Sequence, residues 1–237
     1  MGELMEEAPA RALAVYAHPD DPEVSCGGVL ARWAEAGTEV HAVVATRGDK
    51  GSHDPATDPE ALARRRAREV AAAAEVLGLA GVELLGHDDG ELGAVPGLVR
   101  ELVGVLRRLR PDVVVGVDPT AVFFGDAYVN HVDHRAIGWA TLDAVAPAAS
   151  SPLYFPGEGP VHQVATVLLS GTLEPDVWVD VGPTLDAKVR AMFCHRSQLA
   201  PDADQWLGDF VRQRAAEEAR RVGVAYAEGF RRLRLVL

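Results

Sequence analysis

Short apolar runs alternate with longer segments of helical pattern over the first 145 residues. The apolar runs are nearly continuous, which is typical of strands buried on both faces, and they span residues 12–17, 40–46, 82–85 and 112–117. A segment with helical pattern follows each run, at 27–36, 60–77, 96–109 and 131–145. This order predicts an α/β protein with a three-layer, Rossmann-like fold, in which a mostly parallel sheet has helices on both faces.

The pattern changes after residue 145. Residues 146–160 are rich in proline, serine and glycine and predict a loop. The elements expected beyond this loop are three strands and two helices, namely strands at 164–170, 176–181 and 226–236 and helices at 184–195 and 204–222. We therefore expect residues 1–10 to form a flexible tail and residues 11–237 to form a single domain with an embellished C-terminal third.

Composition excludes several classes of protein. The 237 residues include 23 Lys and Arg against 35 Asp and Glu, for a net charge of −12, so nothing supplies the cationic surface that nucleic-acid binding needs. No apolar run approaches the roughly 20 residues of a membrane helix, and the acidic N-terminus does not resemble a signal peptide. Two cysteines cannot build a disulfide framework in a chain of this length, which favours a reduced, cytoplasmic setting.

A polar cluster follows the first predicted strand directly, in the sequence His18-Pro19-Asp20-Asp21-Pro22-Glu23. Ligands of open α/β sheets bind at the carboxyl ends of the strands, which is where this cluster falls. The spacing of His18 and Asp21 can aim an imidazole and a carboxylate at one ion, whereas Asp20 would project differently. The alternative is that the two aspartates are turn and capping residues and that His18 is a surface histidine.

A second cluster, Asn130-His131-Val132-Asp133-His134, follows the fourth predicted strand and opens a helix. His131 and His134 are three residues apart and share one helical face, so one could bind a metal while the other donates a proton. Asp133 is placed to accept a hydrogen bond from an imidazole. Two histidines and one carboxylate are a common ligand set of catalytic zinc sites, and a neighbouring free carboxylate suits a general base. Together the two clusters predict metal-dependent hydrolysis.

These motifs carry a family resemblance. AHPDDPEVSCGG, followed far downstream by NHVDHRAIG, resembles the PIG-L/LmbE-type deacetylases, metal-dependent enzymes that remove the acetyl group from N-acetylglucosamine conjugates and related amides. Further segments resemble the family in the same order, namely TRGD at 46–49, the R-x-x-E helix at 66–69, Asp89-Gly90, and KVRAMFCHRSQ at 188–198. The similarity covers roughly residues 11–200, and the stretch from Pro201 onward matches nothing we can name.

The resemblance implies a role for each site residue. The metal ligands would be His18, Asp21 and His134, with Zn²⁺ as the cofactor and Fe²⁺ as an alternative. Asp20 would be the general base, His131 would stabilise the oxyanion or protonate the leaving amine, and Asp133 would orient a histidine. Arg66 and Asp89 would hold the sugar.

Some positions depart from the family pattern or stay open. Pro22 stands where the usual HPDDE motif has its glutamate, which comes one residue later, and Asn130 replaces the glycine that often precedes HxDH. Tyr128 lies near that motif, where some members use a tyrosine. Four residues keep two possible roles. His195, Ser197 and Gln198 could make structural contacts or form a wall of the pocket, and Arg47 could bind an anion or form an ion pair.

We therefore expect a Zn-dependent hydrolase that removes an N-acetyl group from a small N-acetylglucosamine-type conjugate. The alternatives within the family are a mycothiol-S-conjugate-type amidase and a deacetylase of antibiotic or glycopeptide intermediates. A different class is a non-catalytic Rossmann-like binding protein, although the first turn lacks the G-x-G-x-x-G motif of a dinucleotide site. The charged segment 204–222 could cover a neighbouring copy in a homo-oligomer.

Overall fold

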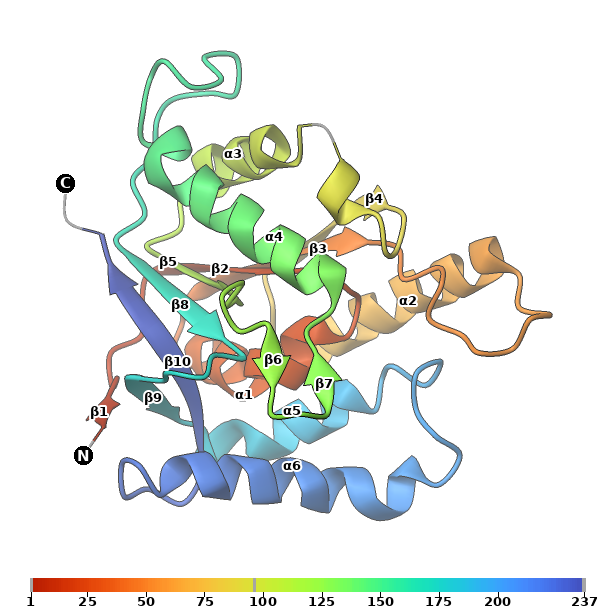
Figure 1. Cartoon of the computed structure of the whole chain (residues 1–237). Helices are drawn as coiled ribbons and strands as arrows, with labels where there is room; N and C mark the ends of the chain where they lie inside the picture. Colours follow the sequence, from red (N-terminus) through yellow and green to blue (C-terminus); the bar gives the residue numbers. More distant parts are fainter. Residues whose placement is uncertain (1, 96, 236–237) are drawn as a thin grey trace.

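The computed structural model describes residues 2–95 and 97–235 of the chain (Figure 1). An eight-stranded central sheet runs through the molecule. Its strands, in spatial order, are β1 (Glu3–Leu4), β9 (Val177–Asp180), β10 (Ala227–Arg234), β8 (Thr166–Ser170), β5 (Val113–Val117), β2 (Arg11–Tyr16), β3 (Glu39–Thr46) and β4 (Gly81–His87). All neighbouring pairs are parallel except those of β10, which is antiparallel to both β8 and β9.

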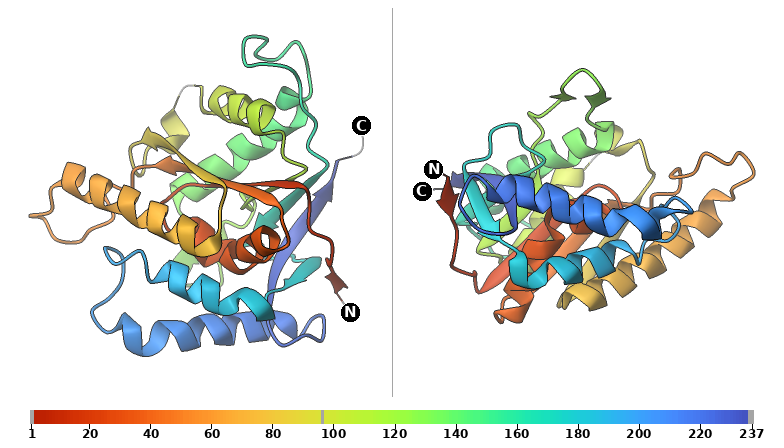
Figure 2. Two further views of the ribbon diagram at one scale, coloured as in Figure 1. Left: turned by 180° about the vertical axis from the view of Figure 1, so that it is seen from behind. Right: turned by 90° about the horizontal axis from the view of Figure 1, so that it is seen from below.

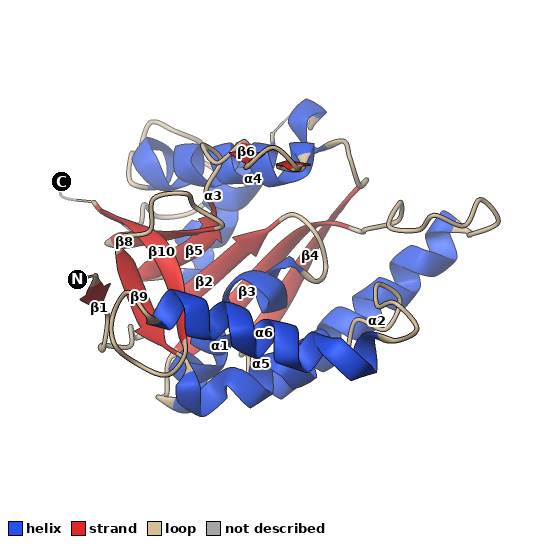
Figure 3. Ribbon diagram, turned by 60° about the horizontal axis from the view of Figure 1, so that its bottom comes forward, coloured by secondary structure: helices blue, strands red, loops and turns tan. Residues whose placement is uncertain are grey.

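Helices cover both faces of the sheet, as the views in Figures 2 and 3 show. The helices on one face are α1 (Asp21–Glu35), α2 (Pro59–Leu77), α5 (Leu185–Met192) and α6 (Ala203–Ala219). Those on the other face are α3 (Leu98–Leu109), α4 (Val132–Asp143) and the irregular helical turn η2 (Ala144–Ala149). Single 3₁₀ turns, η1 (Leu92–Ala94) and η3 (Gly182–Thr184), precede α3 and α5. The predicted three-layer α/β architecture with a mostly parallel sheet is thus confirmed.

The central strands are buried because both faces of the sheet are covered. Every residue of β5 is buried, and so are all but the first of β2. The start and end of α2 are fixed by residues that favour helix termini. Asp58 caps the first turn by accepting a hydrogen bond from the Glu60 backbone N–H, and Gly78 ends the helix with a φ of 71°.

The α1 helix begins six residues before the predicted start at residue 27. Its backbone is non-helical at Cys26 (φ −145°), so a first turn from Asp21 is followed by a second helical part that starts where the sequence pattern indicated. The carboxylate of Glu228, on β10, accepts hydrogen bonds from the Gly28 and Val29 backbone N–H groups at 3.1 and 2.8 Å. A side chain distant in sequence therefore caps the second part of α1.

Other departures from the sequence expectation are local. Within the expected flexible tail, Glu3–Leu4 instead pair with Val177 and Trp178 of β9. The expected loop 146–160 begins inside η2, and a two-stranded hairpin of β6 (Phe123–Phe124) and β7 (Tyr128–Val129) was not predicted. Pro96 and Val236, the outer residues of two predicted elements, lie outside the described residues. Within the described ranges, no helix is long and apolar enough to cross a membrane.

Candidate active site

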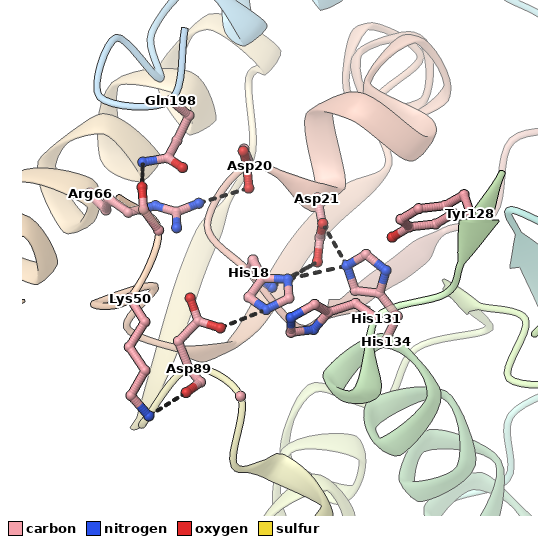
Figure 4. A pocket seen from close by; sticks show the side chains of 12 residues that line it. His18, Asp20, Asp21, Lys50, Arg66, Asp89, Tyr128, His131, His134 and Gln198 are labelled. Carbon is pink, nitrogen blue, oxygen red and sulfur yellow. Dashed lines mark hydrogen bonds and ion pairs between the residues drawn. The ribbon is translucent and has the colours of Figure 1, made fainter. Parts of the chain in front are cut away.

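A cavity of about 490 Å³ opens at the carboxyl edge of the sheet (Figure 4). It is lined by His18, Asp20, Asp21, Lys50, Gly51, Arg66, Asp89, Gly90, Tyr128, His131, His134 and Gln198. The structure thus brings seven of the eight predicted site residues to one cavity, and the eighth, Asp133, lies buried directly behind it with no exposed surface. The residues come together because β2 lies between β3 and β5 in the sheet. The chain connections after β2 and β5 lead toward opposite edges of the sheet, which leaves a crevice at the carboxyl ends of these strands.

Three potential metal ligands converge at one wall of this cavity. His18 Nδ1 lies 3.1 Å from His134 Nε2 and 3.3 Å from Asp21 Oδ2, and His134 Nε2 lies 3.2 Å from Asp21 Oδ1. The backbone N–H of His18 also donates to Asp21 Oδ2 at 2.7 Å, which fixes the turn between strand and helix. Two imidazole nitrogens and a carboxylate facing one point could hold a divalent metal ion, so the donor set fits the group that the motifs imply.

Asn130 orients one of these ligands. Its Oδ1 accepts the Nδ1–H of His134 at 2.9 Å, and its Nδ2 donates to the Ala121 carbonyl at 2.9 Å. This contact leaves the His134 Nε2 lone pair for the cluster, and it gives Asn130 a role that the sequence did not indicate.

Asp133 supports a different histidine from the one beside it in sequence. Its carboxylate accepts the backbone N–H groups of Gly90 and Leu92 at 2.6 and 3.0 Å. It lies 3.4 Å from His18 Nε2 but 4.0 Å from His131 Nδ1. A second set of side chains could also bind a metal ion, namely His18, His131 and Asp133. Asp133 is fully buried behind the cavity, whereas Asp21 and His134 line it, which favours the set with Asp21 and His134.

The carboxylates around His18 determine its charge in the metal-free protein. Burial by itself would lower the pKa of His18, but the contacts with Asp133, Asp21 and Asp89 outweigh burial and raise it to about 12. Burial would likewise raise the pKa of Asp21, yet His134 and His18 hold it below the ordinary value. His18 Nε2 lies 3.2 Å from Asp89 Oδ1, so Asp89 faces a ligand as well as the cavity.

His131 is held as a hydrogen-bond donor. It is the N-cap of α4, and its Nδ1 accepts the backbone N–H of Asp133 at 3.2 Å. An acceptor Nδ1 places the proton of the neutral ring on Nε2. Burial, and after it the charge of His18, lower the pKa of His131, which further favours the neutral ring.

Asp20 is held by Arg66. Arg66 Nη2 donates to Asp20 Oδ1 at 2.8 Å, from a guanidinium that is only 3% exposed. Arg66 and Asp89, both predicted to hold a sugar, therefore line the cavity but already contact other site residues.

The comparisons with known proteins place the chain in a family. The family model described as PIG-L, GlcNAc-PI de-N-acetylase, matches residues 13–145. The chain is 30% identical over 225 residues to the diacetylchitobiose deacetylase of Thermococcus kodakarensis, and this match covers 93% of the chain and 82% of that protein. The chain belongs to the PIG-L family. The resemblance inferred from the two histidine and aspartate motifs is confirmed.

Two solved structures are similar to almost the whole chain. The N,N′-diacetylchitobiose deacetylase from Pyrococcus horikoshii, in complex with its inhibitor MPG, gives a TM-score of 0.85 at 29% identity, covering 95% of this chain and 84% of that one. The 4-carboxy-2-hydroxymuconate hydratase from Pseudomonas putida KT2440 gives 0.79 at 26% identity, covering 96% and 97%. A hydratase thus shares this architecture with deacetylases, so the fold alone does not decide the reaction.

Lys50 of the cavity wall was not predicted, because the TRGD resemblance ended at Asp49. Lys50 Nζ donates to the Asp89 carbonyl at 2.6 Å and to Glu91 Oε1 at 2.7 Å. Tyr128 reaches the cavity from the unpredicted β6–β7 hairpin.

The residues left open by the PIG-L motifs divide into two groups. Gln198 lines the cavity, and its Nε2 donates to the Gly51 carbonyl at 3.2 Å. His195 is buried against Glu23 at 3.1 Å, and Ser197 donates to Glu69 at 2.5 Å, so both connect the segment between α5 and α6 to α1 and α2. Arg47 pairs with Glu60 and Asp88 at 2.6 Å, and these ion pairs account for its guanidinium without a bound anion.

Proposed function

We propose that this protein is a metal-dependent deacetylase that hydrolyses the N-acetyl amide of a small N-acetylglucosamine-type sugar or glycoconjugate. The observation that carries the proposal is the convergence of His18, Asp21 and His134 beside Asp20 and His131 in one cavity. A ligand triad, a separate carboxylate and a separate hydrogen-bond donor are the parts that metal-assisted amide hydrolysis needs. Membership of the PIG-L family supports the same reaction class.

The proposed cofactor is Zn²⁺, with Fe²⁺ as the alternative, because two imidazoles and one carboxylate suit either ion. His18, Asp21 and His134 would hold it. When bound, the ion would polarise the acetyl carbonyl and lower the pKa of the attacking water.

The side chains around the triad have distinct tasks in this proposal. Asp20 removes a proton from the attacking water as its oxygen bonds to the acetyl carbon. His131 donates its Nε2–H to the carbonyl oxygen as negative charge develops there. The carbon–nitrogen bond then breaks, the proton taken by Asp20 passes to the nitrogen, and the products are acetate and a free amine. A neutral His131, with Nδ1 already accepting a hydrogen bond, suits the donor role better than delivery of a proton to the amine.

Asp133 and Asp89 hold His18 from the side opposite the other two ligands. Their carboxylates lie 3.4 and 3.2 Å from His18 Nε2. They therefore orient the ring so that Nδ1 faces Asp21 and His134. Asp89 also borders the cavity, where it is available to a sugar hydroxyl.

The test is release of primary amine from a panel of N-acetylated substrates, detected with fluorescamine in metal-loaded and chelator-treated protein. The panel contains an N-acetylglucosamine disaccharide, an N-acetylglucosaminyl inositol, a mycothiol S-conjugate and an acylated glycopeptide. We expect chelator-sensitive amine release from at least one of them. Asp20→Asn, which keeps the shape of the side chain but not its basicity, should reduce the rate by about 10²–10⁴-fold.

The same assay separates the other functions. Consumption of 4-carboxy-2-hydroxymuconate without any amine release would identify a hydratase, the activity named for a structural relative. Saturable sugar binding without turnover of any substrate would identify a non-catalytic binding protein. Either result would overturn the proposal.

Cytoplasmic location and a homo-oligomeric state are also proposals. The support for an oligomer is an exposed aromatic pair on α6, Trp206 and Phe210, which lie one helical turn apart with ring centres separated by 6.2 Å. Light scattering coupled to size-exclusion chromatography would give the mass in solution, and a monomeric mass would contradict this proposal.

A further inference from the structure

A second, smaller cavity of about 170 Å³ adjoins the active-site cavity. Three side chains border both cavities, namely Asp21, Tyr128 and His134, so the two cavities meet at two of the three proposed metal ligands. The walls of the second cavity come from the ends of β5 and β8, from α1 and from the β6–β7 hairpin. It is therefore a separate space that reaches the ligand cluster from another direction.

The order of the strands places the two cavities on opposite sides of β2, the strand that precedes the first ligand. Arg66 and Asp89 line the larger cavity, and they belong to α2 and to the turn after β4, on the side of β3 and β4. Val117 and Ser170 line the smaller cavity, and they end β5 and β8 on the other side. In Figure 4, Arg66 and Tyr128 accordingly lie on opposite sides of the ligand histidines.

The two most deeply buried polar side chains of the second cavity are already paired within the protein. The Ser170 hydroxyl donates to the Gly116 carbonyl at 3.0 Å and accepts the Tyr16 hydroxyl at 2.8 Å. The Asn130 side chain is engaged by His134 and by a backbone carbonyl, each at 2.9 Å. Because a polar ligand atom would find few free partners at that depth, the cavity favours an apolar ligand.

Apolar groups supply much of the remaining wall of this cavity. Val117 contributes its side chain, Phe124 its ring and Gly171 only backbone. Gly171 is exposed, so one side of the cavity lies next to solvent. A water molecule occupies about 30 Å³ in the liquid. A methyl group is of similar size, so the methyl of an acetyl group would leave most of the 170 Å³ unfilled.

The amide bond of the proposed substrate determines which part of it faces each cavity. A secondary amide is planar and trans, so its acyl chain and its amine substituent leave the carbonyl group in opposite directions. The polar sugar matches the larger cavity, which is lined by the charged groups of Lys50, Arg66 and Asp89. With the carbonyl at the ligand cluster, the acyl chain then points toward the second cavity.

We propose that the second cavity is an acyl subsite that accepts N-acyl groups longer than acetyl, of three or four carbons. This inference rests on the proposed function, in which the ligand cluster binds the amide carbonyl. Hydrolysis of an N-propionyl or N-butyryl amide follows the same steps: one water adds to the carbonyl carbon, the carbon–nitrogen bond breaks, and the products are a short-chain carboxylic acid and the free amine. The buried methylene groups add binding energy that an acetyl group does not supply.

The experiment measures kcat/KM for a series in which one amine, that of the best N-acetyl substrate, carries an acetyl, propionyl, butyryl or octanoyl group. We expect kcat/KM to rise about fourfold per methylene from acetyl to butyryl, because burial of each methylene contributes about that factor. The octanoyl group should gain nothing further, since its chain extends beyond the cavity into solvent. A kcat/KM that does not rise from acetyl to butyryl would overturn the inference.

A substitution on α1 tests where the acyl chain lies. Ser25 lines the second cavity, whereas its neighbour Val24 is 53% exposed and lines neither cavity. Ser25→Leu should fill the cavity and lower the ratio of butyryl to acetyl kcat/KM by about tenfold. Val24→Leu, the matched control, should keep the wild-type ratio. If Ser25→Leu fails to fold, Phe124→Ala replaces it and should move the optimum to a chain longer than butyryl. A wild-type ratio in Ser25→Leu would contradict the proposed location.

A binding measurement separates failure of this inference from failure of the proposed function. Metal-loaded protein is titrated calorimetrically with acetate, propionate and butyrate, and a crystal structure is determined with butyrate. We expect the affinity to increase about fourfold per methylene, with the alkyl chain beside Val117 and Phe124. Equal affinities, or a chain that lies in the larger cavity, would overturn the inference.

This measurement needs no turnover, so it decides whether the acyl subsite exists even if no N-acetyl substrate releases amine and the proposed function fails. Conversely, amine release from N-acetyl substrates but not from their N-propionyl and N-butyryl counterparts would refute the subsite and leave the proposed function standing.

Discussion

The Nδ1–H of His134 is donated to Oδ1 of Asn130, four residues earlier, over 2.9 Å. The amide orientation follows from its other contact, because the Asn130 nitrogen faces the Ala121 carbonyl, which can only accept. The lone pair of His134 Nε2 therefore faces Asp21 and His18. Asn130 orients His134 through this single hydrogen bond.

Asn130→Ala should weaken metal binding by about 10–100-fold, the usual effect of removing a hydrogen bond that orients a ligand histidine. The ring of His134 could then rotate or take the other tautomer. Competition against a fluorescent chelator at fixed pH measures the affinity. Asn130→Asp keeps an acceptor at the same place and should retain more of the affinity than Asn130→Ala. Equal affinities for the wild type and Asn130→Ala would show that the contact has no such role.

Metal binding should be tighter at higher pH. Because the pKa of His18 is about 12 in the metal-free protein, this ring is charged at neutral pH and must lose a proton when Nδ1 becomes a ligand. One displaced proton corresponds to an affinity that rises about tenfold per pH unit between pH 7 and 9. Isothermal titration calorimetry in two buffers of different ionisation enthalpy measures the proton count. A count of zero would contradict the charged state of His18.

The stability of the metal-free protein should change in the opposite direction. The folded pKa of His18 lies above its ordinary value of 6.5, so the stabilisation from its charge is complete below pH 6.5 and is lost as the pH rises toward 12. Urea unfolding of chelator-treated protein should therefore show His18 contributing less at pH 10 than at pH 7. His18→Gln removes this contribution, and the pH dependence of the variant should be correspondingly flatter.

The buried strands and the strand-end clusters were predictable because the signals are local. Val113–Val117 is a run of apolar residues that only a sheet covered on both faces can bury, and His18 and Asp21 are close in sequence. The carboxyl ends of parallel strands then bring the second cluster, around His131, to the same edge. Order along the chain and strand direction were enough for this part of the site.

The remaining contacts around the site could not be predicted, because the sequence near each residue does not indicate which distant residue it contacts. Arg66 and Asp20 are 46 residues apart, and an arginine-rich helix does not show which of its charges turns inward. Glu228 lies 200 residues from Gly28, in a segment that resembles nothing recognisable. Asp133 was expected to orient a histidine, but only the fold shows that His18 is the nearer one.

Substitution of His131 should separate catalysis from folding. His131→Ala removes both the Nε2–H donor and the N-cap of α4, so kcat should fall by about 10²–10³-fold and stability by about 1 kcal/mol. His131→Asn is the matched control, because asparagine is a good N-cap but too short to replace the donor. We expect it to lose kcat and keep stability, as measured by amine release and urea unfolding. An Asn variant with full kcat would rule out the donor role.

Loss of Lys188 should destabilise the protein far more than loss of an exposed ion-pair partner on the same helix. Lys188 Nζ lies 2.5 Å from Glu228 Oε1 and donates to the Val24 carbonyl at 2.9 Å, so the buried pair ties β10 and α5 to the kink in α1. Lys188→Met leaves the Glu228 carboxylate buried without its cation, which costs about 3–5 kcal/mol. Asp186, on the same helix as Lys188, forms an exposed pair with Arg212 of α6, and Asp186→Ala should cost less than about 1 kcal/mol. Urea unfolding gives both values. Because the kink at Cys26 lies in the helix that Asp21 begins, Lys188→Met should also weaken metal binding, whereas Asp186→Ala should not. Equal stability losses in the two variants would show that the buried pair does not secure this part of the site.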